Sequence, residues 1–198
     1  MNKILQINTS LHQDSATSSQ LADQLARRLM NQHSGDLIKR DLGELDIPHL
    51  SAEQHAGFSL PREQRSPAQK QAAQLSDTLI QELRDSDTII IGLPLYNFGI
   101  PSALKAWIDH VARAGETFNY TSEGPKGTLT GKQVYVIATR GGQYAGTDSD
   151  LQTPYLQQVL GFIGLDQVKF IYAEGLAMGD LRDQSIAEAK IEISKLAA

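Results

Sequence analysis

Hydroxyl-bearing residues crowd the stretch from Thr9 to Ser19, which reads TSLHQDSATSS; six of its residues are Ser or Thr. The stretch leads into a helical pattern, and the first amides of a helix, with the positive end of its dipole, form an anion site. Hydroxyl groups there can donate short hydrogen bonds to phosphate oxygens. The stretch therefore predicts a phosphate cradle, with the alternative that Thr17 or Ser18 is a simple N-cap.

Two aromatic rings and an amide stand where a short polar turn is expected. Tyr96, Asn97 and Phe98 separate a buried apolar run from a helical pattern, with Pro94 and Gly99 on either side. Asn97 and Gly99 permit tight or left-handed backbone, so this loop can bend around the rim of a flat heterocycle. The alternative is that the two rings only cover the edge of a sheet.

A third loop follows a later apolar run and reads Thr139-Arg140-Gly141-Gly142. Adjacent glycines let the backbone approach a ligand closely, and their amides can donate to a developing negative charge. A Gly-Gly pair alone is usually a turn, but three such loops at one sheet edge are a stronger indication. Together they fit FMN, with its phosphate at the first loop and its ring between the second and third.

Strands and helices alternate along the chain and must position these loops. A capping box at Ser66 with Pro67 marks one helix start, and Pro101 and Thr153-Pro154 mark two more. Residues 43–65 look irregular. We expect strands at 3–9, 37–42, 88–92, 134–139 and 168–173, and helices at 18–33, at 67–84, from 101, from 154 and at 183–196.

This alternation predicts an α/β fold in which both faces of a parallel sheet are covered by helices. We expect residues 1–198 to form a single flavodoxin-like domain, a three-layer sandwich with five parallel strands in the order 2-1-3-4-5. Ligands of such folds bind outside the carboxyl ends of the strands, where the order reverses. The three loops follow strands one, three and four, and therefore belong to that edge.

Composition excludes several classes of function. The net charge of −5 and the scattered basic residues disfavour nucleic-acid binding, and the absence of cysteine excludes disulfides and thiol chemistry. The opening MNKILQINTS has too short an apolar run for a secretory signal, and no segment is long and apolar enough for a membrane span, so we expect a cytoplasmic protein. The histidines lack metal-site spacing, and G-x-G-x-x-G and G-x-S-x-G motifs are absent.

Longer motifs resemble one bacterial family, the FMN-dependent NADH:quinone oxidoreductases, also called azoreductases. The matching motifs are Pro-x-Tyr-Asn-Phe, Arg-Ala-Gly-x-Thr-Phe, Arg-Gly-Gly and Gly-Phe-Ile-Gly, carried by residues 94–127, 129–142 and 153–175. With the loop at Ser10 added, the resemblance covers essentially the whole chain. It implies a ping-pong enzyme with one FMN per subunit, which takes electrons from NADH or NADPH to reduce quinones and cleave aromatic azo compounds.

The resemblance also assigns residues. Family members are homodimers whose active sites lie at the subunit interface, and no catalytic acid or base is named for this chain. The phosphate would contact the first loop, at Ser10, Ala16, Thr17 and Ser18. The flavin ring would contact the second loop, at Leu95, Tyr96, Asn97 and Phe98, and the third, at Thr139, Arg140, Gly141 and Gly142. Two aromatic residues, Tyr120 and Phe162, would lie near the substrate.

The chain departs from the family pattern at two site positions. Ala16 replaces a common serine and Leu95 a common methionine. We expect the backbone N–H of Ala16 to remain available to the phosphate. The competing function is a flavodoxin-type electron carrier, which binds FMN without turnover; the mild net charge and the nearby Arg113, Lys126 and Arg140 favour the enzyme. A module that has lost its cofactor is the third alternative.

Overall fold

A five-stranded parallel sheet forms the centre of the computed structural model, which describes residues 2–33, 35–60 and 62–196. Strand β3 lies in the middle of the sheet and is buried along its whole length, because helices cover it on both faces. In chain order the strands of this sheet are β1 (Lys3–Asn8), β2 (Asp36–Asp41), β3 (Thr88–Pro94), β6 (Gln133–Thr139) and β7 (Gln167–Ala173).

The strands lie in the order β2-β1-β3-β6-β7. Counted among themselves, these five strands follow the order 2-1-3-4-5, and the two remaining numbers belong to a hairpin that the sequence did not predict. All the pairings are parallel, so the carboxyl ends meet at one edge: Asn8 pairs with Gly92, and Pro94 with Thr139. The order reverses between β1 and β3, which places the loops after these strands side by side.

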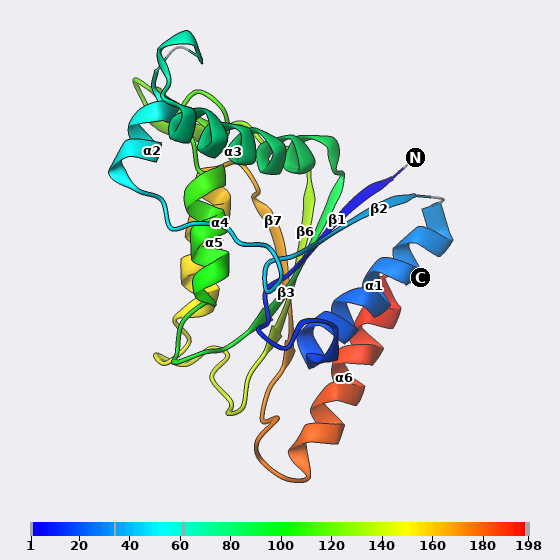
Figure 1. The fold of residues 1–198 in the computed structure, drawn as a ribbon. Coiled ribbons are helices and arrows are strands. Elements are labelled where there is room, and N and C mark those ends of the chain that lie inside the picture. Colours follow the sequence, from blue (N-terminus) through cyan, green and yellow to red (C-terminus); the bar gives the residue numbers. More distant parts are fainter. Residues whose placement is uncertain (1, 34, 61, 197–198) are drawn as a thin grey trace.

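Helices form the outer layers of the sandwich (Figure 1). Helices α1 (Thr17–His33) and α6 (Leu181–Leu196) cover one face, where Leu25, Ile90 and Ile193 belong to one core cluster. The larger core cluster lies on the other face and includes Trp107. That face is covered by α3 (Pro67–Asp85), α4 (Ser102–Val111) and α5 (Gln152–Phe162), and α2 (Ala52–Phe58) packs against α3.

Local capping explains where several helices begin. The predicted capping box at Ser66 is confirmed: its hydroxyl accepts from the Gln69 amide, and Pro67 is the first helical residue. The prediction that residues 43–65 are irregular is wrong in part, because Ser51 makes a second capping box with Gln54 and starts α2. The sequence motif Ser-x-x-Gln was present there, but the helix that it begins is only seven residues long.

The start of α5 also differs from its prediction. Thr153 does not cap this helix, which already begins at Gln152. Instead, the Asp150 carboxylate accepts from the amide of Thr153 at 3.1 Å and from its hydroxyl at 2.7 Å. Asp150 therefore satisfies donors of the first turn in the way an N-cap residue does.

A small antiparallel hairpin, β4 (Phe118–Thr121) and β5 (Gly124–Gly127), lies outside the main sheet. Its return strand packs tightly against the end of α5: a Cβ on Gly127 would lie 2.0 Å from the amide nitrogen of Gly164. Only glycine fits so close a backbone approach. The sequence GPKG has little strand propensity, which is why the hairpin was not predicted.

Candidate functional site

Three loops meet at the carboxyl edge of the sheet. We define the first loop as residues 10–18, the second as 94–99 and the third as 140–148. The Ser10 and Tyr96 hydroxyls are 2.9 Å apart, which joins the first loop to the second. The rings of Phe98 and Tyr144 meet edge to face at 5.7 Å and join the second to the third. Segments far apart in the chain therefore form one continuous site.

A pair of hydroxyl groups bridges the first and second loops. The Tyr96 hydroxyl accepts from the Leu11 amide at 3.2 Å, and the Ser10 hydroxyl accepts from the His12 amide at 3.1 Å. The two hydroxyls carry two protons, and the hydrogen bond between them uses one. One proton is therefore left to donate to a ligand at this point of the site.

Free backbone donors lie at the start of α1. The prediction that the Ala16 amide remains available to a phosphate is wrong, because this amide donates to the carbonyl of Gln13 at 3.1 Å within a short 3-10 turn. In the part of the chain that the structure describes, the amides of Thr17, Ser18 and Ser19 have no acceptor, as expected for the first turn of a helix. The free amides of this turn thus begin at Thr17.

Ser18 presents a different group from the one its sequence position suggests. Its hydroxyl oxygen is buried beneath the first turn of α1 and, among the described residues, has no hydrogen-bond partner. A phosphate oxygen is about as large as a water molecule and cannot reach an atom that water cannot reach. Ser18 can therefore contribute only its amide to an anion, whereas Thr17 and Tyr96 are partly exposed.

The second loop is a tight turn with its apex at Asn97 and Phe98. Both residues have left-handed backbone, with φ of 50° and 62°. This is expected for Asn97 but not for Phe98, because a left-handed conformation strains a bulky residue by roughly 1–3 kcal/mol. Gly99 is not left-handed; its amide and carbonyl instead pair with those of Tyr96. The Phe98 side chain at this apex is 53% exposed.

Gln152 fastens the second loop and was not predicted as a site residue. Its buried side-chain amide donates to the carbonyl of Pro94 at 3.0 Å and to that of Gly99 at 2.9 Å. The amide of Leu95 donates to the carbonyl of Thr139 at 3.0 Å. No local sequence motif identifies Gln152, because it acts on residues more than fifty positions away.

The third loop turns its carbonyl groups toward the segment after β7. The carbonyls of Arg140, Gly141 and Gly142 accept from the amides of Leu176, Ala177 and Gly175 at 2.9–3.1 Å. Within the described residues, the amides of Gly141 and Gly142 have no acceptor. These two amides are the free donors that the loop offers to a ligand.

Arg140 offers no accessible group to a ligand, although its buried Nε has no hydrogen-bond partner among the described residues. Its guanidinium is fully buried and bonds to Asp150 at 2.8 Å and Glu174 at 3.1 Å, and its amide donates to the carbonyl of Ala173. The Glu174 carboxylate also accepts from the amides of Tyr144 and Ala145. Arg140 therefore shapes the third loop from beneath. Asp150 and Glu174, its partners, were not predicted as site residues.

The buried ion pair predicts a pH dependence of stability. Burial alone would raise the pKa of Asp150, but hydrogen bonds from Arg140 and Thr153 outweigh it and hold the pKa below its ordinary 3.8. A carboxylate with a lowered folded-state pKa stabilises the fold above its unfolded-state pKa, and this stability is lost as pH falls through the folded-state value. As pH falls below about 4, we expect the free energy of unfolding of the parent protein to decrease more steeply than that of Asp150→Asn. Urea titrations at several pH values measure this, and the same pH dependence in both proteins would contradict the prediction.

The side chain of Tyr144 lies close to Gly142 of the third loop and contacts Phe98 of the second. A Cβ on Gly142 would lie 2.8 Å from the Tyr144 hydroxyl oxygen. The expected ring slot between the second and third loops is therefore filled by Tyr144, which would have to rotate for a ring to enter. A hollow of about 640 Å³ adjoins the other side of the second loop, lined by Leu11, Tyr96 and Ile100 among others. Its volume suits a cofactor-sized molecule.

Tyr120 and Phe162 lie together but apart from the three loops. Both rings contact Phe118, with centroid distances of 5.4 Å for Tyr120 and 4.3 Å for Phe162. Tyr120 is 77% exposed. Among the described residues, no hydrogen bond or aromatic contact joins this cluster to the loops.

Metal-ligand clusters and membrane-spanning helices are both absent from the part of the chain that the structure describes. No group of three or more His, Cys, Asp or Glu side chains is placed to hold a metal ion in residues 2–33, 35–60 and 62–196. No helix in these same ranges has the length and apolar character that crossing a membrane requires.

Comparisons with known proteins agree with this fold. A family described as having a flavodoxin-like fold matches residues 2–197. An FMN-dependent NADH:quinone oxidoreductase of Cellvibrio japonicus is 48% identical over 196 residues, which cover 98% of each chain. An FMN-dependent NADH-azoreductase of Bacillus anthracis, solved in complex with FMN, has a TM-score of 0.87 and 25% identity over the full length of both chains. An azoreductase from the same species has a TM-score of 0.90 at 24% identity, covering 100% of this chain and 99% of the other.

Proposed function

The chain belongs to the family with the flavodoxin-like fold, and from that premise we propose that it is an FMN-dependent NAD(P)H oxidoreductase that reduces quinones and cleaves aromatic azo compounds. FMN is its cofactor and NADH or NADPH its electron donor. When bound, FMN would supply the two-electron chemistry that links the nucleotide to the acceptor in a ping-pong cycle. A single domain and a cytoplasmic location, both expected from the sequence, belong to the same proposal.

The free donors of the site fit the two ends of FMN. The amides of Thr17 and Ser18 and one proton of the Ser10–Tyr96 pair would hold the phosphate. Each hydrogen bond to a charged oxygen is worth about 1.5–3 kcal/mol, so a few of them bind a dianion without a fixed cation. Ala16 contributes the shape of the turn, because its amide is already bonded to Gln13.

The polar rim of the ring would lie against the second and third loops. The backbone and side chain of Asn97 and the free amides of Gly141 and Gly142 would face its oxygen and nitrogen atoms, with Leu95, Tyr96 and Phe98 as apolar neighbours. The carbonyls of Gly141 and Gly142 are held by amides of the segment after β7, and donors fixed in this way stabilise negative charge on a ring. Thr139 and Arg140 hold the third loop in place. Protons for the acceptor are supplied by water in this proposal.

We place the enzyme in a homodimer with its active sites at the interface. The support is that Tyr120 is exposed on a hairpin and Phe162 lies beside a small apolar hollow of about 260 Å³ lined also by Tyr155 and Val159. Both are remote from the loops of their own chain. Across an interface, these aromatic residues would lie near the substrate and contact flat aromatic acceptors.

The observation that carries the proposal is that the first and third loops, joined through the second, each hold amides without an acceptor among the described residues. The test is to add FMN to the apoprotein and then to measure NADH oxidation with menadione and with an azo dye. We expect a yellow complex of one FMN per chain and turnover with at least one acceptor. FMN binding without turnover would identify an electron carrier instead, and no FMN binding would refute the site.

Phe162→Ala separates the substrate site from the cofactor site. We expect KM for a quinone or dye to rise several-fold while FMN affinity changes less than twofold, because Phe162 contacts Phe118 and not the loops. Removing a partly buried ring also lowers stability, so the loaded enzyme is compared with Phe170→Ala, a ring of β7 packed on the same core cluster. Loss of FMN affinity with unchanged KM would place Phe162 in the cofactor site.

A further inference from the structure

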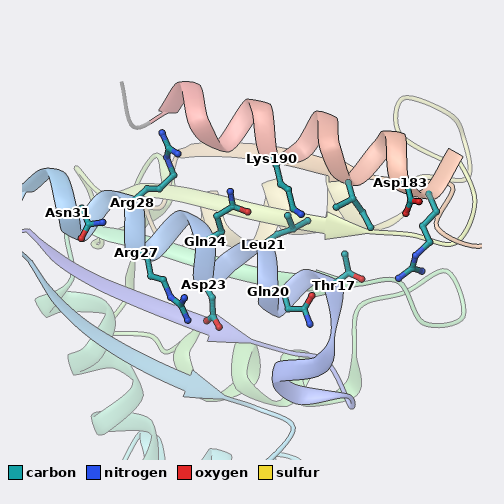
Figure 2. Close-up of a pocket in the computed structure, with 12 residues that line it drawn as sticks. Thr17, Gln20, Leu21, Asp23, Gln24, Arg27, Arg28, Asn31, Asp183 and Lys190 are labelled. Atoms are coloured by element: carbon teal, nitrogen blue, oxygen red, sulfur yellow. The ribbon is translucent and has the colours of Figure 1, made fainter. Parts of the chain in front are cut away.

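A groove of about 660 Å³ runs between α1 and α6, on the face of the sheet away from α3, α4 and α5 (Figure 2). We call it the α1/α6 groove. Leu21 and Ile186 give it an apolar part, and the side-chain amides of Gln20, Gln24 and Asn31 line it as well. Thr17 lies at one end, so the groove begins at the turn proposed for the FMN phosphate.

Four cations line the α1/α6 groove: Arg27, Arg28, Arg182 and Lys190. In the described part of the chain, none of them forms an ion pair, whereas Lys39, Arg84, Lys105, Arg113 and Lys169 all do. The groove has two carboxylates, Asp23 and Asp183, and Asp23 is already bonded to Lys39 and Gln6. The lining thus holds four cations and one uncommitted carboxylate, on a protein whose net charge is −5.

The cations are spread along the groove. Figure 2 shows Lys190 reaching from α6 toward α1, with Arg28 and Asn31 at the end opposite Thr17 and Asp183. Single long hydrogen bonds hold two guanidinium groups to backbone carbonyls: Arg28 to Ser194 at 3.3 Å and Arg182 to Leu176 at 3.4 Å. Their other N–H groups remain available. Thr17 and Asn31 are about 21 Å apart along the helix axis, so an elongated ligand with more than one anionic group fits better than a single phosphate.

We propose that the α1/α6 groove binds the nucleoside diphosphate part of a nucleotide, with ADP as its simplest form. The cations bind the two phosphate groups, since guanidinium and ammonium groups both recognise phosphate. Leu21 and Ile186 contact the flat base, and the Gln and Asn amides match the donor and acceptor pattern at a base edge. This binding does not depend on the proposed redox function.

The first test measures ADP binding to the apoprotein by calorimetry, without turnover. We expect Lys190→Glu to weaken binding at least tenfold and Lys195→Glu, the same charge change elsewhere on α6, to change it less than twofold. Binding should weaken as salt is raised, because exposed charges are screened. No binding at millimolar ADP, or equal losses in the two variants, would overturn the proposal. Inorganic diphosphate binding as tightly as ADP would overturn the contact with the base.

The same chemistry occurs in free ADP and in the ADP half of the electron donor. Kinetics with NADH and with reduced nicotinamide mononucleotide, which lacks that half, distinguish the two sources. A rise in KM for NADH alone in Lys190→Glu assigns the groove to the donor. Unchanged KM for both, with weakened ADP binding, assigns it to free nucleotide. Only this kinetic comparison rests on the proposed function. If the enzyme proves inactive, the calorimetric measurement of ADP binding still tests the proposal.

Discussion

Thr17→Asp is expected to lower FMN affinity at least a hundredfold while leaving the fold as stable as before or slightly more stable. Thr17 begins α1, whose first turn holds no acidic residue. A carboxylate there interacts favourably with the helix dipole by about 0.3–1 kcal/mol. The same carboxylate repels each unit of phosphate charge by roughly 3 kcal/mol at about 5 Å and an effective dielectric near 20.

The two effects of Thr17→Asp have opposite signs, which separates loss of binding from loss of structure. FMN affinity is read from quenching of flavin fluorescence, and stability from thermal unfolding of the apoprotein. Thr17→Asn has nearly the same shape without the charge and should bind FMN within a few-fold of the parent. If Thr17→Asp binds FMN as tightly as Thr17→Asn, the phosphate does not lie at the start of α1.

Arg140→Met is expected to destabilise the apoprotein by about 3–5 kcal/mol, because removing one partner leaves buried carboxylates uncompensated. The Arg140 side chain is fully buried between Asp150 and Glu174, whose side chains are 6% and 14% exposed. The third loop would lose its support at the same time, so we also expect weaker FMN binding. Chemical denaturation and FMN titration measure the two effects.

An exposed ion pair provides the control for Arg140→Met. Lys105 and Asp109 pair one helical turn apart on α4 with 52% and 35% of their side chains exposed. Lys105→Met should change stability by no more than about 0.5 kcal/mol. A loss of less than about 1 kcal/mol in Arg140→Met would mean that the third loop does not depend on this ion pair. FMN binding that survives unchanged would mean that the loop is not part of the cofactor site.

Periodicity and turn chemistry made the main fold predictable. The β-branched run at 88–92 and the capping box at Ser66 are local patterns, and each produced the expected element. The hairpin was missed because β5 lacks strand-forming residues and depends on the close approach of Gly127 to Gly164. The short helix α2 was missed because seven residues show too little periodicity.

The sequence predicts which loops form the candidate site, but not which of their atoms are free to bind a ligand. Glycines, hydroxyl groups and aromatic residues indicate where a ligand fits, and the first and third loops do offer free amides. The sequence cannot tell which groups are already used, since that depends on distant partners: Glu174 lies 34 residues from Arg140, and Gln152 lies 58 from Pro94. The burial of the Ser18 hydroxyl likewise follows from packing beneath α1.

The two hydrogen bonds from the Gln152 side-chain amide have a mechanical consequence for the second loop. Pro94 and Gly99 are the two ends of that loop, so one side chain holds both ends of the loop at a fixed separation. Only the apex at Asn97 and Phe98 keeps conformational freedom, and ordering one residue costs about 1–2 kcal/mol of backbone entropy. The clamp confines that cost to two residues, so a flat ligand meets a rim that is already rigid everywhere except at its tip.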